Sequence, residues 1–106
     1  MDDKTHRWCA SRATVFKALG HPTRVFIVQE LSKGEECVCH LTEKIGADIS
    51  TVSKHLAILK SAGIVSDDKR GLQVFYKLRM PCVLGVFGCV DKIMAEDLRD
   101  RESLIR

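Results

Sequence analysis

The feature that most constrains the fold is the spacing of apolar residues between positions 41 and 62. They recur at steps of three and four in two short runs, which are Leu41 and Ile45, then Val52, Leu56, Leu59 and Ala62. This spacing is typical of helices with one buried face, so it predicts two short helices. Gly46 can end the first helix in a left-handed conformation, and Ser50 can cap the start of the second. Two helices joined by so short a turn form a helix-turn-helix.

The outward face of the second helix carries short hydroxyl side chains and a cation. The candidate residues on it are Ser50, Thr51, Ser53, Lys54 and, beside the core stripe, His55. Such groups at the N-terminal end of a helix can reach base edges and phosphates in a major groove, so we expect them to contact DNA. An ordinary solvated helix face is the alternative. His55 could also flank the core and bond to a backbone group.

The residues that follow predict a β-hairpin. The chain enters at 64–67, DDKRG at 67–71 forms the turn with Gly71 at a positive-φ position, and 73–78 return with β-branched and aromatic residues. The expected tip is basic through Lys69 and Arg70, its arginine could enter a minor groove, and Gln73 is a further candidate contact. A helix-turn-helix followed by such a hairpin is a winged helix. The expected fold class is therefore mainly α with a small β-hairpin.

Charge is concentrated in the same part of the chain. Residues 50–79 hold six Lys or Arg against two Asp, a net charge of +4, whereas the whole chain has a formal net charge of +3. A surface that faces phosphates requires such an excess of positive charge. Uneven surface charge is common in proteins, so this observation supports the helix-turn-helix assignment without establishing it alone.

Three segments together resemble a known family. STVSKHLAILKSAGIV at 50–65, KRGLQVFY at 69–76 and ALGHPTRVFIVQEL at 18–31 are similar to the ArsR/SmtB family of metal-responsive repressors, and the match covers roughly residues 14–80. The resemblance implies a homodimeric winged-helix repressor that sits on an inverted-repeat operator until an inducer binds. It also implies that helices at both ends of the chain form the dimer interface.

Both ends of the chain carry an apolar helical face. The N-terminal face comprises Trp8, Val15, Phe16 and Leu19, and the C-terminal face comprises Cys82, Val86, Cys89, Val90, Ile93 and Leu98. Little of the chain is left to cover such faces, so we expect one winged-helix domain over residues 1–106 with terminal dimerisation helices. Between these parts, His21 and Pro22 can cap and start a helix, although RVFIV at 24–28 would also suit a strand.

The segment ECVCHL at 36–41 places two thiols beside the helix-turn-helix. Cys37 and Cys39 lie just before and at the start of its first helix, where backbone amides and the helix dipole favour a thiolate. Within a regular helix, side chains two positions apart point in directions about 200° apart. Binding one ion through both sulfurs would therefore require a distorted helix start. Such a distortion would reduce the population of the DNA-competent form.

The resemblance extends to these thiols. The CVC sequence is similar to the metal box of the arsenic and cadmium/lead branches, which implies that Cys37 and Cys39 are ligands of As(III)/Sb(III) or Cd(II)/Pb(II). The third cysteine of the arsenic branch is replaced here by Thr42. The cadmium/lead branch recruits cysteines from the other subunit, and Cys9 is the candidate for that role. The branch that senses zinc, nickel or cobalt through its last helix is disfavoured, because no histidine follows His55.

Cys82 and Cys89 are separate from this pair. The favoured interpretation is that they are small hydrophobic residues at the dimer interface. A second metal site and a thiol switch are the alternatives, since some members of the family respond to oxidants or persulfide. A thiol-redox or persulfide-sensing repressor of the same fold therefore stays open, as does a DNA-binding protein that ignores metals and uses its cysteines only for packing.

Composition excludes other classes of protein. The longest nearly apolar run, at 81–90, is ten residues, whereas a membrane span needs about twenty, and no secretion signal is present at the N-terminus. We expect a cytoplasmic protein with reduced thiols and no membrane partner. The CVC spacing and its context differ from those of thiol oxidoreductases, so we expect no enzyme, no catalytic residues and no obligatory cofactor.

Overall fold

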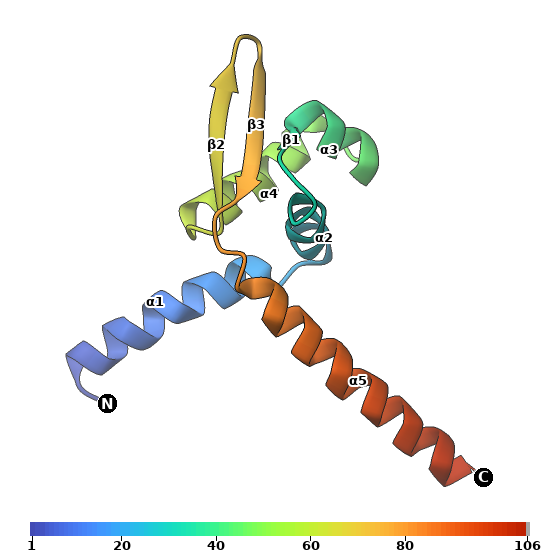
Figure 1. Cartoon of the computed structure of the whole chain (residues 1–106). Helices are drawn as coiled ribbons and strands as arrows, with labels where there is room; N and C mark the ends of the chain where they lie inside the picture. The colour runs from blue at the N-terminus through green and yellow to red at the C-terminus, as the bar shows by residue number, and fades with distance from the viewer. Residues whose placement is uncertain (106) are drawn as a thin grey trace.

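The computed structural model describes the backbone of residues 1–105 and the side chains of residues 1–104. The elements in chain order are α1 (Asp3–Leu19), α2 (Pro22–Leu31), β1 (Glu36–Cys37), α3 (Val38–Ile45), α4 (Ile49–Ser61), β2 (Val65–Arg70), β3 (Gln73–Leu78) and α5 (Val83–Ile105). Helices α2, α3 and α4 gather around the sheet, whereas α1 and α5 diverge from this body toward the two termini (Figure 1). The expected fold class, mainly α with a small β-hairpin, is confirmed.

The core lies where α2, α3 and α4 meet the base of the hairpin. Its fully buried side chains are Ile27, Val28, Leu41, Val52, Leu56, Leu59 and Ile64. Four of these were predicted from the apolar spacing of the helix-turn-helix. Burial of each such aliphatic side chain stabilises the fold by about 1.5–3 kcal/mol relative to exposure. The core therefore fixes the orientation of α4 against α2 and α3.

Helix α2 begins as the sequence predicts. Nδ1 of His21 accepts a hydrogen bond from the backbone N–H of Thr23 at 3.0 Å, and Pro22 is the first helical residue. The alternative strand assignment for 24–28 is wrong, because this segment is helical and buries Ile27 and Val28 against neighbouring helices. The capped start and the packing on α4 outweigh the preference of β-branched residues for strands.

The turn of the helix-turn-helix differs from the prediction at one cap. Gly46 ends α3 in the left-handed conformation, with φ of 76°, as expected. Helix α4 is capped by Asp48, however, and not by Ser50. The Asp48 carboxylate accepts a hydrogen bond from the backbone N–H of Thr51 at 3.2 Å, and the Ser50 hydroxyl donates to the same carboxylate at 3.1 Å. Both are good capping residues, but the helix begins at Ile49, two residues earlier than capping by Ser50 would allow.

The hairpin is longer than predicted and belongs to a three-stranded sheet of order β1-β3-β2. Residues 67–70, expected in the turn, extend strand β2 and pair with β3. The turn consists of Gly71, with φ of 63°, and Leu72, which is fully exposed. The residue at the tip is thus apolar, and Lys69 and Arg70 lie just below it. Strand β1, which was not predicted, adds Glu36 opposite Tyr76 and Cys37 opposite Phe75.

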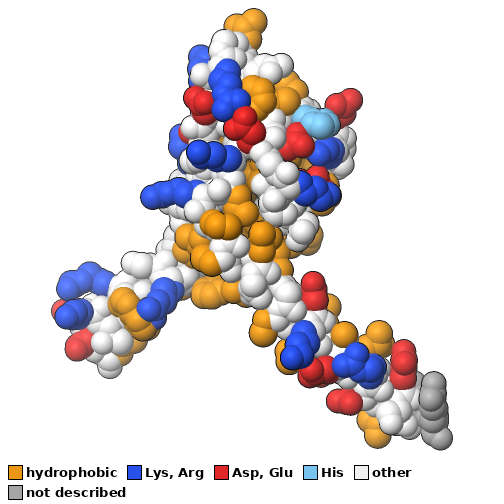
Figure 2. Space-filling model, in the orientation of Figure 1, with side chains coloured by type: hydrophobic (Ala, Val, Ile, Leu, Met, Phe, Trp, Pro, Cys, Tyr) orange, Lys and Arg blue, Asp and Glu red, His pale blue; other side chains and the backbone are white. Residues whose placement is uncertain are grey.

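The terminal helices leave apolar side chains uncovered. Exposed apolar residues on them include Trp8, Phe16, Val86, Val90, Ile93 and Leu98. Hydrophobic side chains are visible along both helices and where they leave the body (Figure 2). Helix α5 begins at Val83, so Cys82 lies in the turn before it and does not share a regular helix with Cys89, contrary to the prediction. Within residues 1–105, no helix combines the length and apolar character needed to cross a membrane.

Candidate nucleic-acid interface and cysteine pair

Helix α4 separates a buried face from a polar exposed face. Val52, Leu56 and Leu59 are fully buried. The exposed polar side chains near its N-terminus are Ser50, Thr51, Ser53 and Lys54, and the apolar Ile49 is exposed beside them. This arrangement places the predicted hydroxyls and the predicted cation on one accessible surface. Side chains of this size at the start of a helix suit contacts in a major groove.

His55 differs from these residues because it is half-buried and has a side-chain partner. Nη1 of Arg24 donates a hydrogen bond to Nδ1 of His55 at 3.1 Å. The rings of His55 and His21 lie 4.5 Å apart between centroids. Burial, followed by the charges of His21 and Arg24, lowers the pKa of His55, so its neutral form is favoured. Because arginine only donates, the proton of the neutral ring lies on Nε2.

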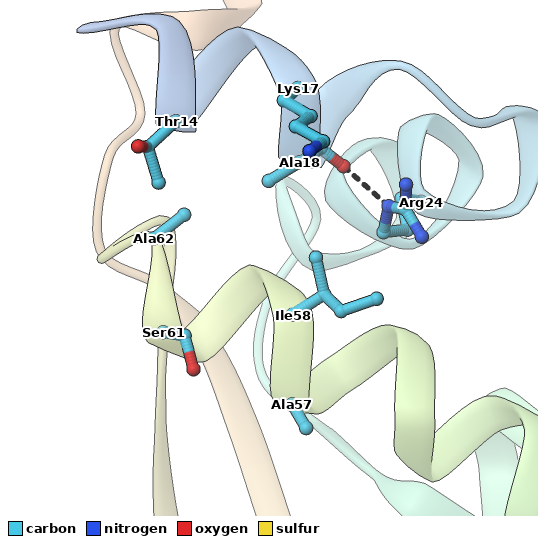
Figure 3. Close-up of a pocket in the computed structure, with 8 residues that line it drawn as sticks. All are labelled: Thr14, Lys17, Ala18, Arg24, Ala57, Ile58, Ser61 and Ala62. Atoms are coloured by element: carbon cyan, nitrogen blue, oxygen red, sulfur yellow. Dashed lines mark hydrogen bonds between the residues drawn. The ribbon is translucent and has the colours of Figure 1, made fainter. Parts of the chain in front are cut away.

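Arg24 was missed by the sequence analysis, although it connects three helices. From α2, its Nε donates to the backbone carbonyl of Ala18 at the end of α1, while its Nη1 bonds to His55 on α4. Beside it lies an open groove of about 410 Å³ between α1, α2 and α4, with Ile58 among its lining residues (Figure 3). Arg24 therefore helps to set the position of α4. Its partners lie far away in the chain, so no local pattern indicates them.

The hairpin exposes the three predicted contacts Lys69, Arg70 and Gln73. Arg70 makes two hydrogen bonds to the carboxylate of Glu35, at 2.6 and 3.0 Å. Its Nε also donates to Asp68 at 3.0 Å, and its guanidinium lies 4.6 Å from the centroid of the Phe75 ring. The positive charge of Arg70 is thus partly balanced by two carboxylates, which the sequence analysis did not foresee.

Cys37 and Cys39 lie at the start of α3, as predicted. Cys37 is half-buried and caps the helix, and its Sγ accepts from the backbone N–H of His40 at 3.4 Å. Cys39 is the second helical residue and is exposed. The hydroxyl of Thr42, which stands where the resemblance would place a third cysteine, donates to the backbone carbonyl of Val38 at 2.7 Å. Two thiols therefore lie at the first turn of the helix-turn-helix, one at the cap of α3 and one inside it.

Ion pairs surround the cysteine pair. Nζ of Lys44 lies 2.9 Å from Glu36 and 3.1 Å from Glu30, and Nδ1 of His40 donates to the other oxygen of Glu36. The hydrogen bond from Lys44, with a further one from His40, lowers the pKa of Glu36. His40 is exposed, and its ring forms a hydrogen bond with Glu36. These bonds attach β1 and α3 to the end of α2.

The described residues of one chain do not form a complete metal site. Among the residues that the structure describes, no group of three or more His, Cys, Asp or Glu side chains could hold an ion. Cys9 on α1, Cys82 before α5 and Cys89 on α5 are exposed free thiols. The donor set of Cys37 and Cys39 suits a thiophilic ion but supplies only two sulfurs. A third ligand would have to come from elsewhere, as the sequence analysis expected.

Comparison with known proteins identifies the family. The sequence model described as "Bacterial regulatory protein, arsR family" matches residues 21–67. An uncharacterized HTH-type transcriptional regulator of Methanocaldococcus jannaschii is 39% identical over 82 residues, which are 76% of this chain and 92% of the relative. The cadmium resistance transcriptional regulatory protein CadC homolog of Staphylococcus aureus is 46% identical over 67 residues, 62% of this chain and 55% of that protein.

A solved structure shows the same architecture. It is the homodimeric winged helix-turn-helix DNA-binding domain of a possible ArsR-family transcriptional regulator from Mycobacterium bovis, with a TM-score of 0.79 and 28% identity. The similarity covers 94% of this chain and 93% of that one. The fold, the family match over residues 21–67 and the Methanocaldococcus jannaschii relative all indicate the same family. The chain belongs to the arsR family of bacterial regulatory proteins, whose members are DNA-binding transcriptional regulators and not enzymes.

Proposed function

We propose that this protein is a homodimeric repressor that leaves its operator when a thiophilic ion binds Cys37 and Cys39. The single observation that carries the proposal is the position of these thiols at the first turn of α3, the helix that precedes and packs against the proposed recognition helix α4. The name of the Staphylococcus aureus relative refers to cadmium resistance, which supports a metal inducer. The inducers considered are As(III)/Sb(III) and Cd(II)/Pb(II).

DNA binding is assigned to α4 and to the hairpin. In this proposal Ser50, Thr51, Ser53 and Lys54 contact the major groove, and Lys69, Arg70 and Gln73 contact the flanking backbone or minor groove. His55 was predicted to contact DNA as well, but its bond to Arg24 makes a role in orienting α4 the better supported one. The net charge of +4 over residues 50–79 supports this assignment.

The terminal helices would form the dimer. A mostly apolar groove of about 330 Å³ opens between α1, α2 and α5. It is lined by Phe16, Leu19, Val25, Val86, Phe87 and Val90, together with Gln29 and Asp91. The Mycobacterium bovis domain is homodimeric, which supports the same assembly here. Two-fold pairing would place two copies of α4 about one DNA turn apart, as an inverted-repeat operator requires. We therefore propose that residues 1–106 act as one winged-helix domain with terminal dimerisation helices.

Ion binding would act on the start of α3. When the Cys37 sulfur binds an ion, it no longer accepts the hydrogen bond that caps this helix. Binding of Cys39 to the same ion requires the first turn to distort. Cys9 of the other chain is the proposed third ligand. A hundredfold change in operator occupancy requires the inducer to prefer the DNA-free form by about 2.7 kcal/mol. That preference is small compared with the apparent binding energies of metal–thiolate sites, about 10–16 kcal/mol.

The test is an anaerobic titration of the reduced protein with arsenite and with cadmium. We expect thiolate charge-transfer absorbance that saturates at one ion per chain, and a parallel loss of affinity for an operator duplex measured by fluorescence anisotropy. Replacing Cys37 or Cys39 with Ser should remove both effects. If these variants release DNA at the same ion concentrations as the parent, the cysteine pair is not the inducer site.

A thiol-redox or persulfide switch is the second candidate. Its support is that Cys9, Cys39, Cys82 and Cys89 are all exposed free thiols. Hydrogen peroxide, or a persulfide donor, should then weaken DNA binding in the absence of metal, and dithiothreitol should restore it. Replacing Cys82 and Cys89 with Ser should abolish this response and leave the metal response intact. A protein that binds DNA but ignores both treatments would be a metal-independent DNA-binding protein.

A further inference from the structure

Arg70, next to the hairpin turn, is paired with a residue that precedes β1. Both terminal nitrogens of its guanidinium bond to the carboxylate of Glu35, which is 35 positions away in the chain. Asp68 and the Phe75 ring complete its surroundings. In Figure 1, β1 lies beside β3, which brings the segment before α3 next to the hairpin. The arrangement therefore joins the cysteine-bearing segment to a predicted DNA contact.

The register of the sheet places these side chains on one face. Cys37 lies opposite Phe75, and Phe75 lies opposite Asp68 on its other side. Residues that face each other across antiparallel strands project on the same side of the sheet, as do residues two positions apart in one strand. Glu35 is two positions before Cys37, and Arg70 is two positions after Asp68. Glu35 and Arg70 are therefore on one face of the sheet but on opposite sides of Phe75 along the strands, and the long Arg70 side chain passes over the Phe75 ring to reach the carboxylate.

This ion pair can be exchanged for a bond to DNA. The side chains of Arg70 and Glu35 are 47% and 41% exposed, and ion pairs at such positions contribute little to stability because water screens them. The planar guanidinium binds a phosphate with the same paired geometry that it uses for a carboxylate. A DNA phosphate can therefore replace Glu35, and breaking the ion pair reduces the free energy of DNA binding by a small amount.

We propose that Glu35 is a positioning residue that competes with the DNA backbone for Arg70 and so weakens operator binding. In the free protein, Glu35 directs the guanidinium toward β1. In the complex, Arg70 turns to a phosphate and the carboxylate of Glu35 is left to solvent. The inference rests on the proposed function only in requiring that the hairpin meets DNA. It assigns to Glu35 a role in setting the affinity of the repressor.

The experiment is a double-mutant cycle between Glu35 and Arg70. The probe is a fluorescein-labelled duplex selected with the parent protein from a random library, and affinity is measured by anisotropy over a series of salt concentrations. We expect Glu35→Gln to tighten binding by about threefold to tenfold at low salt, with the advantage shrinking as salt rises. In the Arg70→Gln background, the same Glu35 change should have little effect.

Two comparisons keep the test decisive. Glu43→Gln removes the same charge from an exposed residue of α3 and measures the general effect of charge. If Glu35→Gln tightens binding no more than Glu43→Gln, or tightens it equally without Arg70, the inference is overturned. If no duplex is selected by the parent, the proposed function fails instead. Thermal unfolding of each variant verifies that it is folded, and Arg70→Lys, which keeps the charge but not the paired geometry, should show an intermediate coupling.

Discussion

Cys37 lies directly opposite Phe75 in the ladder between β1 and β3, and the guanidinium of Arg70 lies over the same phenyl ring. The candidate inducer site and the hairpin are therefore parts of one sheet. Cys37 is also the cap of α3, the helix that supports α4. In the proposed function, a change at this one residue can reach both DNA-contacting elements, through α3 to α4 and through β1 to the hairpin.

The capping role of Cys37 predicts different outcomes for two substitutions. Cys37→Ser should leave the free energy of unfolding unchanged or increase it, because a hydroxyl is a good acceptor at a helix N-cap. Cys37→Ala removes the acceptor and should cost about 1 kcal/mol. Urea unfolding of the reduced protein measures both. Cys39→Ala, at an exposed position inside the first turn, is the control and should cost less. An equal loss for Ser and Ala would contradict the capping role.

The structure also predicts which residue stabilises the start of α4. Asp48→Ala should lower the midpoint of thermal unfolding by about 5 °C, because it leaves the N–H of Thr51 without its acceptor. Ser50→Ala removes only a bond to the Asp48 side chain and should have a much smaller effect. The variants are compared at one protein concentration, since a dimer's midpoint depends on it. A larger loss for Ser50→Ala than for Asp48→Ala would indicate that Ser50 is the N-cap, as the sequence suggested.

The helix-turn-helix could be predicted from the sequence because its core residues follow a local pattern. The burial of Leu41, Val52, Leu56 and Leu59 follows from helical spacing, which is a property of neighbouring residues. The extent of the hairpin was less predictable, because charged residues such as Asp67 and Asp68 suit a turn and an exposed strand equally. Strand β1 has only two residues, and its pairing depends on β3, which is distant in the chain.

Only part of the candidate site could be predicted from the sequence. The exposure of Thr51, Ser53 and Lys54 follows from the face of the helix opposite its apolar stripe. The partners of His55 and Arg70 were not predictable, because Arg24 and Glu35 are 31 and 35 positions away from them. Such contacts depend on how the elements pack. Charge counted along the sequence therefore overstated the free positive charge of the hairpin.

The basic residues of the proposed interface can be tested through salt. Replacing Lys54 or Lys69 with Gln should each lower the slope of log K against log salt concentration by about 1, because one fewer phosphate is neutralised. The slopes come from anisotropy titrations with the selected duplex. Lys92→Gln on α5 serves as the control, and it should leave the slope unchanged. If the slope falls equally for all three variants, the predicted phosphate contacts of Lys54 and Lys69 are wrong.

The apolar groove between the terminal helices predicts the oligomeric state. We expect the parent to be a dimer in sedimentation equilibrium, and Val90→Glu to make it monomeric, because the new carboxylate would be buried in an apolar interface. Lys92→Glu places a carboxylate two residues away on the same helix, outside the lining of the groove, and should preserve the dimer. A monomeric parent, or a dimeric Val90→Glu variant, would contradict the assignment.

The surroundings of His55 predict that stability depends on pH. The pKa of His55 in the folded protein is lowered from the ordinary value of 6.5, mainly by burial, with contributions from His21 and Arg24. The unfolded chain therefore binds a proton at a higher pH than the folded one. The stabilising contribution of neutral His55 is fully present above about pH 6.5 and is lost as pH falls below it. Protonation also removes the acceptor that Arg24 uses.

The measurement is urea unfolding at pH 7.5 and at pH 5.5. The parent should lose more free energy of unfolding between these values than His55→Gln, because only the parent takes up the additional proton at this position when it unfolds. Ser53→Ala, a nearby change on the same helix without an ionisable group, should keep the pH dependence of the parent. The difference between the parent and His55→Gln therefore reports on His55 together with its interaction with His21. Equal losses in the parent and His55→Gln would mean that the contact with Arg24 does not stabilise the neutral ring.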